Sequence, residues 1–121
     1  MHAEALERLL AHAGRRACAA ADPARQRAPR SSASAAALRA AFKVPLPEGG
    51  RNPHEVIEAL ADAAEPGLMG NTGSSFFGWV MGASSPVGMA ADLLTAVWGQ
   101  NAAIYQTSPA AAIAEEAVAQ W

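Results

Sequence analysis

Residues Asn71–Pro109 read NTGSSFFGWVMGASSPVGMAADLLTAVWGQNAAIYQTSP. This stretch is apolar and aromatic, but glycine and serine interrupt it where a plain core helix would be continuous. Its large aromatic residues stand beside two glycines: Phe76, Phe77 and Trp79 beside Gly78 and Gly82. Aromatic side chains beside glycine are typical of a pocket wall or a partner interface, because glycine lets a second backbone approach closely. Packing in a core is the alternative for Trp79.

Two Ser-Pro pairs predict helices within and after this stretch. Ser85-Pro86 and Ser108-Pro109 each place a favoured N-cap before a residue that suits the first helical position. We therefore expect helices over 86–98 and 109–121, with Gly99 ending the first of them. Long loops are expected over 66–84 and 99–107.

The N-terminal half also contains residues that start and stop helices. Residues 3–21 carry apolar residues at helical spacing and end at Asp22-Pro23, which predicts a helix. Residues 24–34 are polar and predict a linker or flexible loop. A short helix is expected over 35–42, begun by Ser32 or Ser34, and residues 44–50 should be extended and then turn.

The best-marked helix begins at Asn52. Asparagine is a favoured N-cap, Pro53 suits the first helical position, and Glu55 is placed to complete a capping box. Pro66-Gly67 should stop this helix, whose apolar face is predicted to be Val56, Ile57, Leu60 and Ala64. No stretch alternates as a strand does, so the expected fold class is all-α.

Composition places the chain as one small domain or a piece of a larger one. It has 121 residues, of which 51% are hydrophobic, and alanine is the commonest type, so its helices offer thin side chains for burial. No signal peptide and no apolar run of membrane-spanning length is present, so no membrane partner is expected. Cys18 is the single cysteine, which fits the reducing cytoplasm.

Charge is divided along the chain. All nine lysines and arginines lie within residues 1–51, whereas residues 52–121 carry seven of the eleven acidic residues. The arginines are scattered among alanines without the interleaved aromatic residues that stack on bases. A solvated helix face is therefore favoured over nucleic-acid binding.

Other site chemistries have little support. The glycine-rich turn at residues 70–75 lacks the Gly-Lys-Ser/Thr ending of a nucleotide loop. His2, His12 and His54 are not spaced as a metal set, so no metal is expected. Glu115 and Glu116 are adjacent and point to different sides of a helix, so they are not a general acid/base pair. No histidine follows the serines at 74, 75, 84 and 85, which gives a serine nucleophile little support.

Four segments in order carry a family resemblance: LPEGGRNPHEVIEAL (46–60), SSFFGWVMGASSP (74–86), MAADLLTAVWGQN (89–101) and TSPAAAIAEEAVAQW (107–121). Together they resemble the N-terminal segment of the pyridoxal phosphate-dependent group II amino-acid decarboxylases, which include aromatic-L-amino-acid and glutamate decarboxylases. The likeness covers roughly residues 44–121. It divides the chain into N-terminal helices and linker, 1–43, and an incomplete decarboxylase region, 44–121.

The resemblance implies a fold-type-I enzyme, with an α/β parent fold, that acts as a cytoplasmic homodimer and decarboxylates an amino acid. In that family the N-terminal segment wraps over the partner subunit and lines the substrate pocket. The matching positions make six residues candidates for the pocket wall: Phe77, Trp79, Val80, Gly82, Asn101 and Ala103.

The residues also depart from the family pattern. Gly82 stands where aromatic decarboxylases often carry a threonine that contacts the substrate carboxylate, so the amino-acid substrate stays open. The family places its Schiff-base lysine and phosphate cup in a large domain after this segment, and the only lysine here is Lys43. We therefore expect a truncated fragment, inactive alone, with no catalytic or cofactor-binding residue of its own. The alternatives are a non-enzymatic helical interaction module and a pseudogene remnant.

Overall fold

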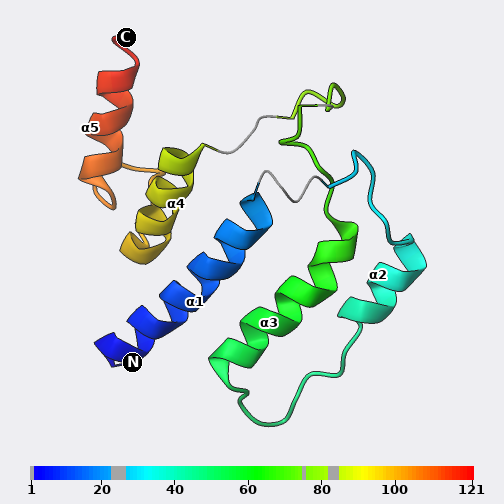
Figure 1. The fold of residues 1–121 in the computed structure, drawn as a ribbon. Coiled ribbons are helices and arrows are strands. Elements are labelled where there is room, and N and C mark those ends of the chain that lie inside the picture. Colours follow the sequence, from blue (N-terminus) through cyan, green and yellow to red (C-terminus); the bar gives the residue numbers. More distant parts are fainter. Residues whose placement is uncertain (1, 23–26, 75, 82–84) are drawn as a thin grey trace. The chain divides into compact units, whose positions relative to one another are not determined.

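The computed structural model describes residues 2–22, 27–74, 76–81 and 85–121. In this part of the chain the structure is helical and contains no strand, so the all-α prediction is confirmed for it (Figure 1). The elements in order are α1 (Ala3–Ala21), α2 (Ala35–Phe42), α3 (Pro53–Ala64), the 3-10 turn η1 (Glu65–Gly67), α4 (Pro86–Trp98) and α5 (Pro109–Val118).

Packing divides the chain into two compact units, Met1–Gly82 and Ala83–Trp121, which are described separately below. The first unit holds α1, α2, α3 and η1, and the second holds α4 and α5. The division at 43/44 rests on the family resemblance rather than on packing, and it stays a prediction.

Capping explains where most helices begin. The side chain of Asn52 accepts a hydrogen bond from the His54 N–H at 2.9 Å, and Pro53 occupies the first turn of α3. Ser34, rather than Ser32, caps α2 by accepting from the Ala37 N–H at 3.1 Å. These local bonds satisfy N–H groups that have no partner within the helix, which is why the predicted starts are confirmed.

In the second unit, a side-chain cap begins helix α4 but not helix α5. Ser85 caps α4 by accepting from the Gly88 N–H at 3.1 Å, and Gly99 ends it at φ 57°, in the left-handed region. Ser108 makes no side-chain cap bond, so its predicted capping role is wrong. Helix α5 also ends at Val118, earlier than predicted, because Gln120 and Trp121 donate to carbonyls only three residues back.

Two predictions about α3 also need correction. In the described part of the chain, Glu55 makes no hydrogen bond back to Asn52, so the capping box does not form. Val56 and Leu60 are exposed, whereas Ile57, Ala61 and Ala64 are half-buried. The contact face of α3 is therefore rotated from the predicted one, towards the side that carries His54 and Glu58.

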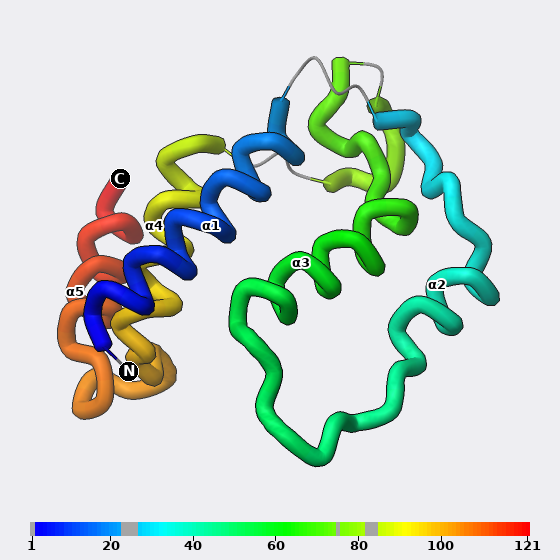
Figure 2. Tube along the Cα trace, turned by 60° about the horizontal axis from the view of Figure 1, so that its bottom comes forward, coloured from blue at the N-terminus to red at the C-terminus, as the bar shows by residue number. Residues whose placement is uncertain are grey.

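In the first unit, α3 is the central helix and contacts both α1 and α2 (Figures 1 and 2). Contacts advance together along α1 and α3, from His12 beside Glu58 to Arg16 beside Asp62, so these helices run in the same direction. Helix α2 starts near the end of α3, where the Ala33 N–H donates to the Pro66 carbonyl, and the connector 43–52 leads back to the start of α3. Helix α2 is therefore antiparallel to α3.

A backbone junction joins the loop 27–34 to the end of α3. The Pro66 carbonyl accepts from the N–H groups of Ser32 and Ala33 at 3.1 and 3.0 Å, and the Gly70 N–H donates to the Ala28 carbonyl at 2.9 Å. The hydroxyls of Ser31 and Ser32 also donate to Pro66. The described part of this predicted flexible loop is thus hydrogen-bonded to residues 66–70.

Apolar burial is slight. Among the described residues no hydrophobic side chain is buried, and Ser108, 2% exposed, is the only buried residue. Alanine-rich helices explain this, because a methyl group offers little area to cover. No described helix combines the length and the apolar character needed to cross a membrane.

Gly70 should be indispensable to the junction. A Cβ at this position would lie 2.2 Å from the Arg27 carbonyl oxygen, which is backbone and cannot rotate away. Gly70→Ala should lower the free energy of unfolding by about 1–3 kcal/mol, measured by urea unfolding followed by circular dichroism.

Gly14→Ala is the matched control, because Gly14 lies in α1 with no atom within 4 Å of the added Cβ. It should raise the free energy of unfolding by roughly 0.5–1 kcal/mol, through helix propensity. Equal effects of the two substitutions would contradict the close approach at Gly70.

Candidate functional site

The aromatic loop of the first unit, residues 76–81, presents its large side chains to solvent. Phe77 is 94% exposed and Trp79 is 82% exposed, whereas Phe76 is half-buried. Trp79 and Val80 have φ angles of 64° and 50°, which are unusual for residues with a Cβ and rarest for a β-branched one. Trp79 therefore does not pack in a core within this unit, and the loop holds a strained turn.

An open hollow of about 460 Å³ lies beside this loop. One wall comes from residues 76–79 and Met69, and the other comes from Pro29, Arg30 and Ser31. Sequence reasoning missed Arg30 and Met69 as lining residues. Arg30 precedes the aromatic loop by more than forty positions, and only the junction between loop 27–34 and residues 66–70 brings them together.

Among the described residues that line the hollow, Arg30 carries the positive charge. Among the described residues, this guanidinium has no ion pair, hydrogen bond or ring contact. Its neighbour Ser31 is engaged, since its hydroxyl lies 3.0 Å from the Pro66 carbonyl oxygen and 3.1 Å from that of Ala33. Arg27 is engaged as well, with Glu65 Oε1 at 3.1 Å. In the part of its lining that the structure describes, the hollow therefore combines aromatic surface with one unpaired cation, Arg30.

The sequence-predicted wall residues fall into three groups. Phe77 and Trp79 line the hollow, while Val80 lies in the same loop but is fully exposed. Gly82 lies outside the described residues. Asn101 and Ala103 belong to the second unit, where the Asn101 Oδ1 accepts from the Ala103 N–H at 3.1 Å.

The turn around Asn101 is closed by a second bond. The Thr107 hydroxyl donates to the Asn101 carbonyl at 2.7 Å, which spans the predicted loop 99–107. The Asn101 side chain therefore shapes its own turn, as asparagine commonly does, and its place in a pocket wall stays a prediction.

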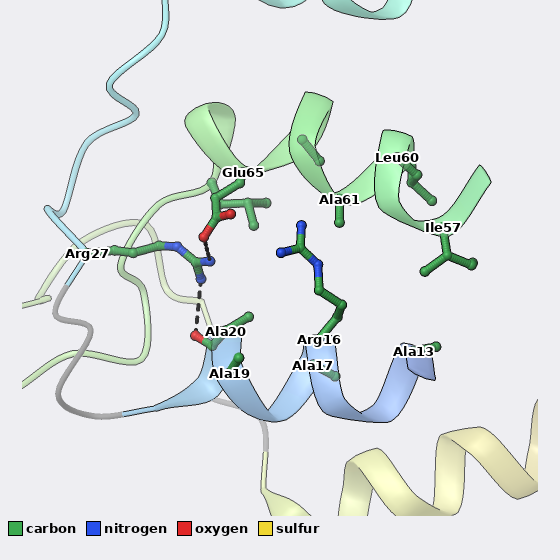
Figure 3. Close-up of a pocket in the computed structure, with 12 residues that line it drawn as sticks. Ala13, Arg16, Ala17, Ala19, Ala20, Arg27, Ile57, Leu60, Ala61 and Glu65 are labelled. Carbon is green, nitrogen blue, oxygen red and sulfur yellow. Dashed lines mark hydrogen bonds and ion pairs between the residues drawn. The ribbon is translucent and has the colours of Figure 1, made fainter. Parts of the chain in front are cut away.

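Ion pairs line the seam between α1 and α3. Arg16 Nη2 lies 2.6 Å from Asp62 Oδ1, and Arg16 Nε lies 3.4 Å from Glu58 Oε2. Figure 3 shows Arg16 reaching from α1 towards α3, and Arg27 bonded to both Glu65 and the Ala20 carbonyl. The hollow drawn there has a volume of about 260 Å³, and alanines make up half of its described lining. Because these side chains are short, polar contacts bridge much of the space beside the two helices.

His12 adds a close but poorly aligned contact to this seam. Its Nε2 lies 2.6 Å from Glu58 Oε1, yet this buried nitrogen has no hydrogen bond of acceptable geometry. The His12 ring meets the His54 ring edge to face, with centroids 4.9 Å apart. In the part of the chain that the structure describes, no group of three or more histidine, cysteine or acidic side chains is arranged to hold a metal ion.

Pyridoxal phosphate does not fit the residues of this chain. Lys43, the only lysine, is exposed at the end of α2, away from any hollow described here. In the glycine-rich turn the Gly73 N–H already donates to the Gly70 carbonyl at 3.2 Å, and no lysine or arginine follows Arg51. A Schiff base and a phosphate cup therefore need residues from elsewhere.

Comparisons of the chain with protein-family models, with curated proteins and with solved structures found no match.

Replacing Asn101 should open its turn without unfolding α4. Asn101→Ala removes the acceptor for the Ala103 N–H, so amide hydrogen exchange at Ala103 should accelerate roughly fivefold, as for the loss of one hydrogen bond. Asn101→Asp keeps an oxygen at that position and should exchange at about the original rate. Equal rates in both variants would show that the side chain does not hold the turn.

The α1–α3 seam should depend on Arg16. Arg16→Met keeps the aliphatic stem but removes the ion pairs to Glu58 and Asp62, so the free energy of unfolding should fall by about 0.5–1 kcal/mol. The loss should shrink at high salt, because these side chains are partly exposed and therefore screened.

Arg15→Met is the control, since Arg15 is an exposed neighbour with no ion pair among the described residues. The free energy of unfolding should change by less than about 0.5 kcal/mol. A loss equal to that of Arg16→Met would mean that helix charge, rather than the seam, explains the effect.

Proposed function

We propose that this chain is the N-terminal, dimer-wrapping part of a pyridoxal phosphate-dependent amino-acid decarboxylase, in which it supplies a wall of the substrate pocket. The four ordered segments that resemble group II decarboxylases support this proposal. The observation that carries it is the exposure of the aromatic loop, where Phe77 and Trp79 stand almost free in solvent. Such side chains are normally covered by another protein surface or by a ligand.

Helix α4 supports the same proposal from the second unit. It carries a single charged residue, Asp92, and its large apolar side chains are exposed: Val87, Met89, Leu93, Leu94, Val97 and Trp98. A helix that is apolar on most of its circumference is normally buried in a larger protein. A partner subunit and a large domain would supply the surface that covers it.

The roles proposed for this chain are structural and steric. Phe77, Trp79, Val80 and Gly82 would shape the pocket wall around the substrate side chain and exclude water from it. Asn101 and Ala103 would lie on a second loop that reaches the active site of the partner subunit. In the parent enzyme, pyridoxal phosphate would be held by residues outside this chain and would supply the electron sink for decarboxylation.

The substrate class is an amino acid, and the proposed compartment is the cytoplasm. Gly82 takes the place of a threonine found in aromatic decarboxylases, which favours a smaller or more polar substrate. Cys18 is a lone, exposed cysteine, as expected of a protein kept in a reducing compartment.

Reading the coding DNA beyond the Trp121 codon tests the proposal most directly. An open frame that continues for about two domain lengths and encodes a His-Lys pair is the expected result. A stop codon, with no such sequence in any frame beyond it, would overturn the proposal. It would favour a free-standing helical module that binds a partner through the exposed aromatic loop.

In the complete enzyme, Phe77→Ala should lower kcat/KM for the amino-acid substrate by roughly tenfold, because a pocket wall is lost. Phe42→Ala is the matched control, since Phe42 is also an exposed aromatic residue but lies outside the resembling region. Its kcat/KM should stay within about twofold of the original. Equal losses would show that Phe77 contributes to folding rather than to the pocket.

A further inference from the structure

We infer that the hollow between the aromatic loop and Arg30 binds a small amphipathic carboxylate. The carboxylate would pair with the Arg30 guanidinium, and the apolar part would lie on Phe76, Phe77 and Trp79. This inference goes beyond the proposed function, because it assigns a ligand to the hollow of this chain whether or not a decarboxylase domain follows.

The place of Arg30 at the edge of a hollow, together with its lack of an acidic partner among the described residues, points to an anion. Three other arginines of the first unit have acidic partners: Arg8 pairs with Glu4, Arg16 with Asp62 and Arg27 with Glu65. Arg15 and Arg39 are exposed and have no ion pair among the described residues, but neither is among the residues described as lining a hollow. Arg30 lines the hollow without any such partner among the described residues. Arg30 is exposed and lines the hollow, and an arginine in such a place offers a fork of N–H donors to an incoming anion.

The surroundings favour a carboxylate over a phosphate. Among the described residues, Arg30 is the only charged one that lines the hollow, and the Ser31 hydroxyl is already engaged by carbonyls. A single guanidinium matches the two oxygens of a carboxylate, whereas a doubly charged phosphate is usually held by several donors. The donor set therefore fits one negative charge.

The other residues that line the hollow favour a ligand whose remaining part is apolar. Three aromatic residues, Met69 and Pro29 form the remaining large surface, and the volume of about 460 Å³ falls within the range of small-molecule sites. Aromatic faces accept aryl or alkyl groups by offset stacking and by burial of apolar area. Trp79 is 82% exposed, so a ligand has area to cover.

The two walls are held together before any ligand arrives. The Gly70 N–H bond to the Ala28 carbonyl fixes the backbone on either side, one residue from Met69 and two from Arg30. Bonds from Ser31 and Ser32 to Pro66 add to this on the Arg30 side. Binding then costs less conformational entropy than it would on two independent loops.

The experiment is a titration of the 15N-labelled 121-residue chain with phenylacetate, followed by NMR. The side-chain N–H signals of Trp79 and Arg30 should shift in a saturable way, with a dissociation constant in about the millimolar range, because the hollow is open. Phenylacetamide, which is neutral and of similar shape, should bind roughly tenfold more weakly. Phenyl phosphate, titrated in parallel, distinguishes the two kinds of anion.

Variants separate the charge from the fold. Arg30→Ala should weaken phenylacetate binding roughly tenfold, and Arg30→Lys should weaken it less, because lysine keeps the charge but loses the fork. Arg39→Ala is the matched control: Arg39 is an exposed arginine on α2, also without an ion pair among the described residues. It should leave the dissociation constant unchanged within about twofold. Circular dichroism should show equal helix content in all variants.

Several outcomes would overturn the inference. Equal affinity for phenylacetate and phenylacetamide would show that Arg30 holds no anion. Phenyl phosphate binding tenfold more tightly than phenylacetate would assign the site to phosphate. A chain without helical circular dichroism would lack the hollow altogether. Decarboxylase activity is not measured in any arm, so these results are independent of the open-frame test above.

Discussion

The backbone junction at Pro66 and Gly70 is the constraint on which the first unit depends. It ties the loop after α1 to the end of α3, and it thereby sets both the start of α2 and the position of Arg30. Burial of side chains contributes little to this arrangement, since no described hydrophobic side chain is buried. Hydrogen bonds between backbone groups, together with the lack of a Cβ at Gly70, substitute for a packed core here.

The helix boundaries could be predicted from the sequence because they are local. Asn52, Ser34, Ser85 and Gly99 act on N–H and carbonyl groups only a few residues away, so their effect is encoded within one turn. Ser108, the predicted N-cap that makes no cap bond, is also the only buried residue among those that the structure describes. Its backbone N–H is bonded to the Ile104 carbonyl at 3.2 Å, so the closed turn before it, rather than its side chain, shapes this start.

The site was predicted only in part, because half of it comes from a distant segment. Phe77 and Trp79 were identified as wall residues from their place among glycines, and both line the hollow. Arg30 carries no local signal, since it lies in a polar loop with other arginines. Its role follows from a non-local backbone contact, which neither periodicity nor spacing encodes. The rotated face of α3 has a similar cause: the polar seam with α1 determines it, rather than the apolar pattern.

The left-handed turn at Trp79 and Val80 has a mechanical consequence. Each residue is held in a conformation that costs on the order of 1–3 kcal/mol relative to an extended backbone. A contact that let this backbone return to the extended region would gain that energy in addition to its own interactions. This strain is released only if Trp79 and Val80 leave the turn, so a ligand that binds Trp79 in its present position leaves the stored free energy unchanged.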